Sequence, residues 1–272
     1  MTICIAAISK YKPDSEEEAI IFCTDHMLTI SSGEDELGGF EQSIEKFKIL
    51  GDDKACMLSG NPLLADRIYD NPNRYTKIGD LAKQIYTNMV ALRREAVERR
   101  FSLLGLNLSD AKRMLAEEIK NQHCGELMEL YNKYSIETGV LLLGFDDENE
   151  GRIYSISELG FDDHRDVNFS AIGSGAIQAL NSLLFQRHSK KDSLAKTIYA
   201  VYKAKRNSEV SRGVGRETDL MVLVNSGEKK VFMVGDEKLK ILEKIFEEEV
   251  NLGKQHSKLI EIIGGDENEP KI

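Results

Sequence analysis

The sequence has few cysteines, and their spacing lacks the common metal and redox motifs. The cysteines are Cys4, Cys23, Cys56 and Cys124, and no two of them form a Cys-x-x-Cys pair. Three of them lie in apolar, strand-like runs, where cysteine usually acts as a small buried hydrophobic residue. This usage favours a reducing cytoplasm. We expect the protein to need neither a metal ion nor an organic cofactor.

The sequence also lacks a long apolar run and an excess of basic residues. No stretch approaches the roughly 20 apolar residues of a membrane span. The apolar run at the start of the chain has no basic region before it and is too short for a usual signal peptide. With 36 basic against 46 acidic residues, the net charge is −10, which disfavours binding to nucleic acid or to an anionic membrane.

Short apolar runs separated by polar turns predict antiparallel hairpins in several parts of the chain. The paired runs are TICIAAI with AIIFCTD, KFKIL with KACMLSG, GVLLLGFD with GRIYSIS, and TDLMVLV with VFMV. VNFSAIGSG predicts a strand that runs into glycines. The stretch GEDELGG is acidic and contains glycines, so it predicts a loop.

Between these runs the pattern is helical. An amphipathic stripe is formed by Ile78, Leu81, Ala82, Ile85 and Met89. Further helices are predicted within 176–206 and 236–250. Hairpins alternating with helices indicate an α+β domain, in which two stacked sheets are covered by helices. No linker divides residues 1–272, so we expect a single domain, with a disordered polar tail at 265–272.

The second residue, Thr2, can become a catalytic nucleophile. Methionine aminopeptidase removes Met1 when the next side chain is small, and threonine qualifies. The free threonine then carries a hydroxyl nucleophile and an α-amine base on one residue. The pKa of an α-amine is about 7.7–8.0, so it can be neutral near pH 7. A lone threonine at this position, however, usually has no catalytic role.

Other positions add to this pattern. Asp25 ends an apolar strand in AIIFCTD, and Lys46 opens another strand in EKFKIL. Gly60 ends ACMLSG just before a predicted helix, and Ser174 lies between two glycines in AIGSG. In this order and spacing, the sequence resembles the proteasome β-subunit family of N-terminal nucleophile (Ntn) hydrolases, of the bacterial or archaeal type. The likeness covers roughly residues 2–60 and 139–250.

The resemblance implies a four-layer αββα sandwich and the cleavage of peptide bonds through an acyl-enzyme on Thr2. It implies that Lys46 tunes the site and that Asp25 anchors Lys46. Gly60 would supply a backbone donor to the oxyanion, and Ser174 would support the amine. It further implies a homo-oligomeric ring that acts on peptides or proteins; any unfoldase partner is unknown.

Two departures from the family pattern leave alternatives open. The family usually has Arg-Asp-x-x-Ser-Gly, whereas this chain reads KRNSEVSRGVGRETD, and Asn207, Glu209 or Ser211 would have to support the amine. A catalytically silent proteasome-like scaffold is therefore one alternative, and an amidase of small molecules is another. The segment at about 93–134 also looks longer than in the family and predicts an extra helical insertion.

Overall fold

The computed structural model describes residues 2–32, 35–41, 46–51, 53–70, 72–103, 105, 107, 109–110, 113, 129, 131–226 and 230–254. The chain divides into two compact units, the first ending at Met233 and the second beginning at Val234. Most of the predicted insertion after residue 103 and the whole tail at 265–272 lie outside the described residues. The single domain over 1–272 stays a prediction.

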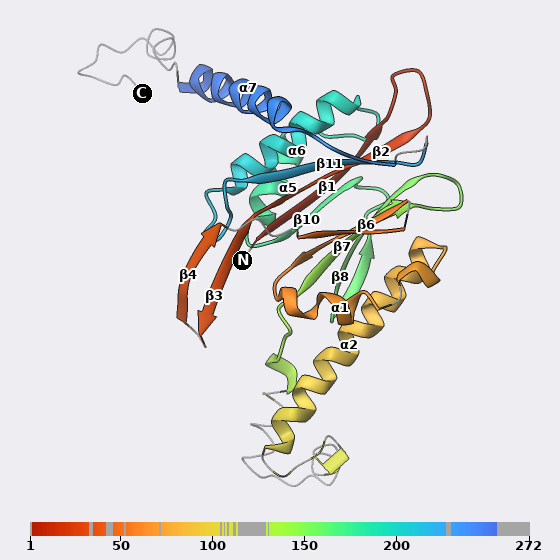
Figure 1. The fold of residues 1–272 in the computed structure, drawn as a ribbon, viewed down its shortest axis with the longest axis vertical. Coiled ribbons are helices and arrows are strands. Elements are labelled where there is room, and N and C mark those ends of the chain that lie inside the picture. The colour runs from red at the N-terminus through yellow and green to blue at the C-terminus, as the bar shows by residue number, and fades with distance from the viewer. Residues whose placement is uncertain are drawn as a thin grey trace, which may run out of the picture. The chain divides into compact units, whose positions relative to one another are not determined.

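The first unit contains a five-stranded antiparallel sheet in the order β10-β1-β2-β11-β12 (Figure 1). Its strands are β1 (Ile3–Lys10), β2 (Glu18–Asp25), β10 (Phe169–Gly173), β11 (Thr218–Val224) and β12 (Val231–Met233). The predicted hairpins β1–β2 and β11–β12 are confirmed, and β2 also pairs with β11. β1 is therefore an interior strand, flanked by β10 and β2.

A second antiparallel sheet has the order β5-β6-β7-β8-β9. Its strands are β5 (Phe47–Leu50), β6 (Lys54–Ser59), β7 (Gly139–Phe145), β8 (Gly151–Ser157) and β9 (Gly160–Asp163). β3 (Met27–Ser32) and β4 (Asp35–Glu41) form a separate hairpin. The prediction of a loop at GEDELGG is wrong from Asp35 onward, because pairing with β3 supplies the hydrogen bonds that override the weak strand propensity of acidic residues and glycine.

Apolar residues on the facing sides of the two sheets form one shared core. β1 contributes Cys4, Ala6 and Ile8, and the second sheet contributes Met57 and Leu141 among others. The alternation follows from the two-residue period of a strand, which places every second side chain on the same face. The opposite face of β1 is also buried, because α6 (Leu194–Ser208) packs against β1 and β2, so these strands read as nearly continuous apolar runs.

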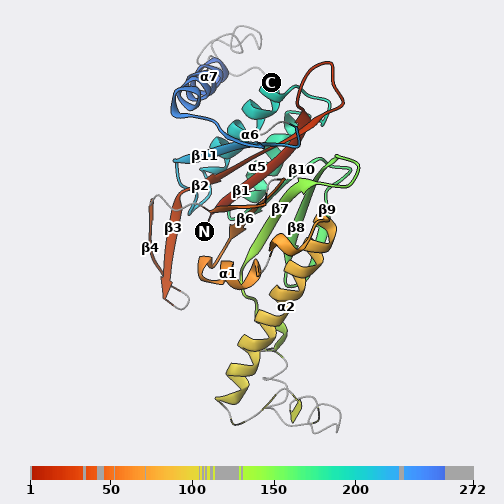
Figure 2. The same cartoon turned by 45° about the vertical axis from the view of Figure 1, so that its right-hand side comes forward.

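Helices cover the outer faces of both sheets (Figure 2). α2 (Ile78–Ser102) buries the predicted stripe against β7, β8 and β9. Three short helices precede α2 in the chain: η1 (Pro62–Leu64), α1 (Ala65–Ile68) and η2 (Pro72–Arg74). Residues of η1 and α1 pack in the same core cluster as the stripe. α5 (Ala176–Phe185) and α6 (Leu194–Ser208) contact β1, β2 and β10. The predicted mixed architecture with two antiparallel sheets and helices is confirmed.

The described part of the second unit is the helix α7 (Asp236–Lys254). This confirms the helix predicted at 236–250, and Asp236 and Glu237 place negative charge in its first turn, where the helix dipole favours it. Among the helices that the structure describes, none combines the length and the apolar character needed to cross a bilayer.

Candidate active site

Thr2 lies immediately before β1 and is almost fully buried. The pairing of Ile3 with Gly173 of β10 holds this end of the strand. Gly173 has a φ of +104°, and a Cβ added there would come within 2.2 Å of the Thr2 carbonyl oxygen. The close approach of the two backbones therefore requires glycine at this position.

The structure brings together three residues that are far apart in the sequence. The Lys46 Nζ lies 2.5 Å from the Thr2 Oγ1 and 2.7 Å from the Asp25 Oδ1. The Thr2 hydroxyl in turn donates to the same Asp25 oxygen. A hydroxyl, an ammonium group and a carboxylate thus form a closed hydrogen-bonded triangle at the end of β1.

Asp25, the last residue of β2, is the most constrained member of the triangle. Its Oδ1 also accepts from the Ile3 amide at 3.0 Å, and its Oδ2 accepts from the amides of Gly215 at 2.8 Å and Met27 at 3.3 Å. Burial raises the pKa of the carboxyl, but the charge of Lys46 and these hydrogen bonds outweigh burial and lower the pKa below its usual value. Asp25 is therefore an anion at neutral pH and a weak base.

Lys46 is fixed from two sides. Its Nζ donates to the Met27 carbonyl oxygen at 2.5 Å, and its own carbonyl oxygen accepts from the Leu58 amide of β6 at 3.0 Å. The side chain is 8% exposed. The ammonium group therefore has little freedom to leave the Thr2 hydroxyl.

Ser174 and Gly60 occupy turns at the ends of strands. Ser174, between β10 and α5, donates its hydroxyl to the Thr2 carbonyl oxygen at 3.3 Å, so this contact holds the backbone of Thr2. Gly60 follows β6 with a φ of +105°, and a Cβ there would lie 2.0 Å from the Glu137 carbonyl oxygen. Support of the amine by Ser174 and the oxyanion role of Gly60 stay predictions.

The three alternatives in the altered motif make different contacts. Asn207 donates to the Ser182 hydroxyl of α5 at 2.9 Å, and Glu209 forms ion pairs with Lys205 and Arg206. Within the described part of the chain, the buried hydroxyl of Ser211 has no hydrogen-bond partner. Asn207 and Glu209 thus bond to side chains of α5 and α6.

Sequence reasoning missed Gly215, whose amide holds Asp25. The contact uses a backbone atom, so no side chain signals it. The only indication was a glycine-containing stretch, SRGVG, directly before a predicted strand.

His26, next to Asp25, bridges two carboxylates. Its Nδ1 lies 2.8 Å from the Glu217 Oε2, and its Nε2 lies 2.8 Å from the Asp219 Oδ2. Burial lowers the pKa of the imidazole, but the hydrogen bonds and charges of Asp219 and Glu217 outweigh it and raise the pKa above its usual value. The imidazole links the end of β2 to the start of β11.

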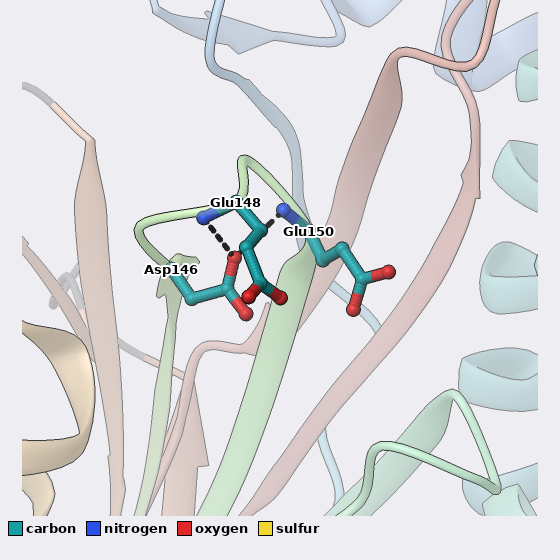
Figure 3. A group of neighbouring side chains, drawn as sticks. All are labelled: Asp146, Glu148 and Glu150. Carbon is teal, nitrogen blue, oxygen red and sulfur yellow. Dashed lines mark hydrogen bonds between the residues drawn. The ribbon is translucent and has the colours of Figure 1, made fainter.

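Three acidic residues gather in the β7–β8 turn, where carboxylates could in principle hold a metal ion (Figure 3). The carboxylate oxygens of Asp146, Glu148 and Glu150 lie within 4.8 Å of one another. Asp146 already accepts from the amides of Glu148 and Glu150 at 3.0 and 2.9 Å, and from the Arg152 Nε at 2.7 Å. The amide bonds close the turn, and Arg152 neutralises the Asp146 carboxylate. The acidic group is therefore explained by its part in the structure of the turn.

Comparison with known proteins supports the fold class alone. The two face-to-face antiparallel sheets and their helices resemble a proteasome-like fold. The solved structure of the Gly-1 mutant of Anbu from Hyphomicrobium sp. strain MC1 matches with a TM-score of 0.56 and 12% sequence identity, over 93% of this chain and 96% of that chain. Anbu is a bacterial proteasome-like protein related to Ntn hydrolases. No family model and no curated protein matches the sequence.

Proposed function

We propose that this protein is a threonine-type hydrolase that cleaves amide bonds, built on the four-layer αββα sandwich of the Ntn hydrolases. The observation that carries the proposal is the position of the Lys46 Nζ, 2.5 Å from the Thr2 Oγ1 and paired with the buried Asp25. Thr2 would act once it is the N-terminal residue of the mature chain. The fold likeness to Anbu agrees with this class.

The electrostatics of the site support a role for each residue in this proposal. Asp25 cannot serve as the general base, because its pKa is lowered. An α-amine ordinarily has a pKa of about 7.7–8.0, so the amine of a terminal Thr2 is the better proton acceptor. As the amine takes the hydroxyl proton, the ammonium group of Lys46 stabilises the negative charge that develops on Oγ1.

The reaction then follows two half-reactions. The Thr2 oxygen bonds to the substrate carbonyl carbon, the C–N bond breaks, and the proton held by the amine passes to the leaving nitrogen. Water next attacks the resulting ester, which releases the acid and returns the proton to the Thr2 oxygen. The Gly60 amide is the proposed donor to the oxyanion.

The same proposal includes the substrate and the assembly. The substrate would be a peptide or protein, and the protein would work as a homo-oligomeric, self-compartmentalising ring without a cofactor. A cytoplasmic location is also part of the proposal, because the buried thiols of Cys4, Cys23 and Cys56 are free.

A catalytically silent proteasome-like scaffold is the second candidate. One observation favours it: Asn207 and Glu209, the two candidates for the place of the family's aspartate, already have other partners. Asn207 is bonded to Ser182, and Glu209 is paired with Lys205 and Arg206. If neither side chain orients the amine, Thr2 would lack a competent base.

Mass spectrometry separates the two candidates. The purified protein is analysed for its first residue and then incubated with a peptide boronate or epoxyketone. The hydrolase predicts Thr2 as the first residue and one adduct on it, which Thr2→Ala abolishes and Thr87→Ala, an exposed threonine on α2, retains. A protein that retains Met1 before Thr2 and forms no adduct would support the scaffold. A panel of peptides and small amides would then separate a peptidase from a small-molecule amidase.

A further inference from the structure

The loop between α6 and β11, residues 209–217, reaches into the candidate active site through one backbone atom. The Gly215 amide donates to the Asp25 Oδ2 at 2.8 Å, and this bond is buried. Glycine has no side chain that could fix this amide, so its direction depends on what holds the rest of the loop. The hydrogen bond to Asp25, and with it the geometry around Thr2, therefore depends on the contacts that fix this loop.

Lys205, near the end of α6, spans the base of this loop. Its side chain is fully buried, although lysine is rarely buried without a partner. Its Nζ donates to the Glu209 Oε1 at 2.6 Å and to the Arg216 carbonyl oxygen. One ammonium group thus contacts the first residue of the loop and the direct neighbour of Gly215.

Further contacts connect the loop to α6 and to the turn after β10. Arg206 also donates to Glu209 at 2.9 Å, which keeps the carboxylate in place. Gly175, directly after Ser174, packs so closely on the end of α6 and on the loop that a Cβ there would meet Ser208 and Val214, each at 2.9 Å. The same segment therefore contacts Asp25 and the turn that carries Ser174.

We propose that Lys205 is a positioning residue, which holds the 209–217 loop so that the Gly215 amide donates to Asp25 and thereby sets the geometry of the Thr2 site. This inference rests on the proposed function for its catalytic consequence. The structural part, a Lys205-dependent bond between Gly215 and Asp25, is testable without any activity. A buried charge is costly unless it is paired and hydrogen-bonded, and here its partners are the first and the next-to-last residues of the loop.

The first readout is hydrogen–deuterium exchange of the full-length protein. In Lys205→Met, the peptide that contains Gly215 should exchange at least about tenfold faster than in the wild type, because a buried charged hydrogen bond is lost. Exchange in α2 should not change. Lys196→Met is the matched control, because Lys196 lies on the same helix in an exposed ion pair with Asp192. Unchanged exchange at Gly215 in a folded Lys205→Met would overturn the inference.

The second readout is the rate of Thr2 labelling by a peptide boronate as a function of pH. The acid limb nearest neutral pH belongs to the α-amine of Thr2. The Gly215 amide helps to lower the pKa of Asp25, so its loss should move to higher pH a second, more acidic limb, at which Asp25 takes up a proton and releases Lys46. Loss of stability alone would leave this second limb in place. The catalytic part is overturned if the wild type is labelled and Lys205→Met exchanges faster at Gly215, but this limb lies at the same pH in both proteins.

Failure of the proposed function and failure of the Lys205 inference give different results. If the wild type is not labelled, the proposed function fails, while the exchange data still decide whether Lys205 holds Gly215. If Lys205→Met does not fold, Glu209→Gln replaces it, because it keeps the volume and removes the counter-charge. Its exchange at Gly215 should rise in the same direction but by less; no rise in folded Glu209→Gln would then count against the inference.

Discussion

At the scale of residues, the candidate site is organised around one carboxylate. Each oxygen of Asp25 accepts more than one hydrogen bond: Oδ1 from Thr2, Ile3 and Lys46, and Oδ2 from Met27 and Gly215. A carboxylate with its lone pairs occupied in this way is kept ionised and immobile. Asp25 can therefore hold Lys46 and Thr2 in place without taking part in proton transfer.

Replacing Lys46 should test this arrangement. Lys46→Met removes the cation beside the Thr2 hydroxyl, so the rate of Thr2 labelling should fall by about 10²-fold. The unpaired Asp25 should also lower the free energy of unfolding by about 3 kcal/mol. Labelling is measured by mass spectrometry and stability by urea denaturation.

Lys48→Met is the control for this substitution, because Lys48 forms an exposed ion pair with Asp66. It should change the free energy of unfolding by less than about 1 kcal/mol. Equal labelling of Lys46→Met and the wild type would remove Lys46 from the proposed mechanism.

The contact between His26 and its two carboxylates should make stability depend on pH. The pKa of His26 is raised in the folded protein, so its contribution is fully present below the unfolded value of 6.5 and is lost as pH rises through the folded value. The difference in urea midpoint between the wild type and His26→Gln should therefore be largest below pH 6.5 and shrink above it. A difference that stays constant from pH 5 to pH 9 would contradict this contribution.

At the scale of elements, the position of Thr2 is set by β1 being an interior strand. β10 and β2 pair with β1 on either side, so the start of β1 cannot fray as chain ends usually do. The turn after β10 returns to the same place, with Gly173 against the Thr2 carbonyl oxygen and Ser174 donating to it.

Gly173→Ala should disturb this junction. The added Cβ would clash with the Thr2 carbonyl oxygen, and alanine disfavours the φ of +104°. We expect a loss of at least about 1 kcal/mol in the free energy of unfolding, together with slower Thr2 labelling. Gly160→Ala in β9 is the control, because a Cβ there has no described atom within 4 Å. A Gly173→Ala protein as stable and as reactive as the control would show that the junction is not tight.

At the scale of the whole molecule, the proteasome-like fold raises the question of assembly. Helix α5 exposes Ile177, Leu184 and Phe185 by 70, 58 and 86% respectively. Apolar side chains gathered on one helix are frequent at contacts between subunits. The proposed homo-oligomer can use this face of α5 as one of its contacts.

Light scattering tests the assembly directly. The wild type should have a mass that is a multiple of the 30.6 kDa chain, and Leu184→Glu with Phe185→Glu should shift it toward the monomer. Charged groups on the face would be desolvated in the contact, which is costly. Leu159→Glu, an exposed leucine in the turn between β8 and β9, should leave the mass unchanged. A wild-type monomer at all accessible concentrations would rule out the ring.

Much of the fold and part of the site could be predicted from local pattern. The buried stripe of α2 and the hairpins β1–β2 and β7–β8 follow from periodicity, which depends only on neighbouring residues. Thr2, Asp25 and Lys46 each stand at the end of a predicted strand, and the resemblance of their order and spacing to proteasome β-subunits predicts that they form one site. The strand β4 was missed because its residues have low strand propensity and depend on β3 for pairing.

By itself, the sequence determined the type and approximate position of most strands and helices, because burial imposes a period of two or 3.6 residues on the chain. It also determined which side chains at strand ends can carry charge or act as nucleophiles. Only the tertiary structure decided that the amide of Gly215 holds Asp25, that Lys205 spans the loop before it, and that His26 meets Glu217. These contacts use backbone atoms or join residues far apart in the chain, so only the packing of the elements in space brings them together.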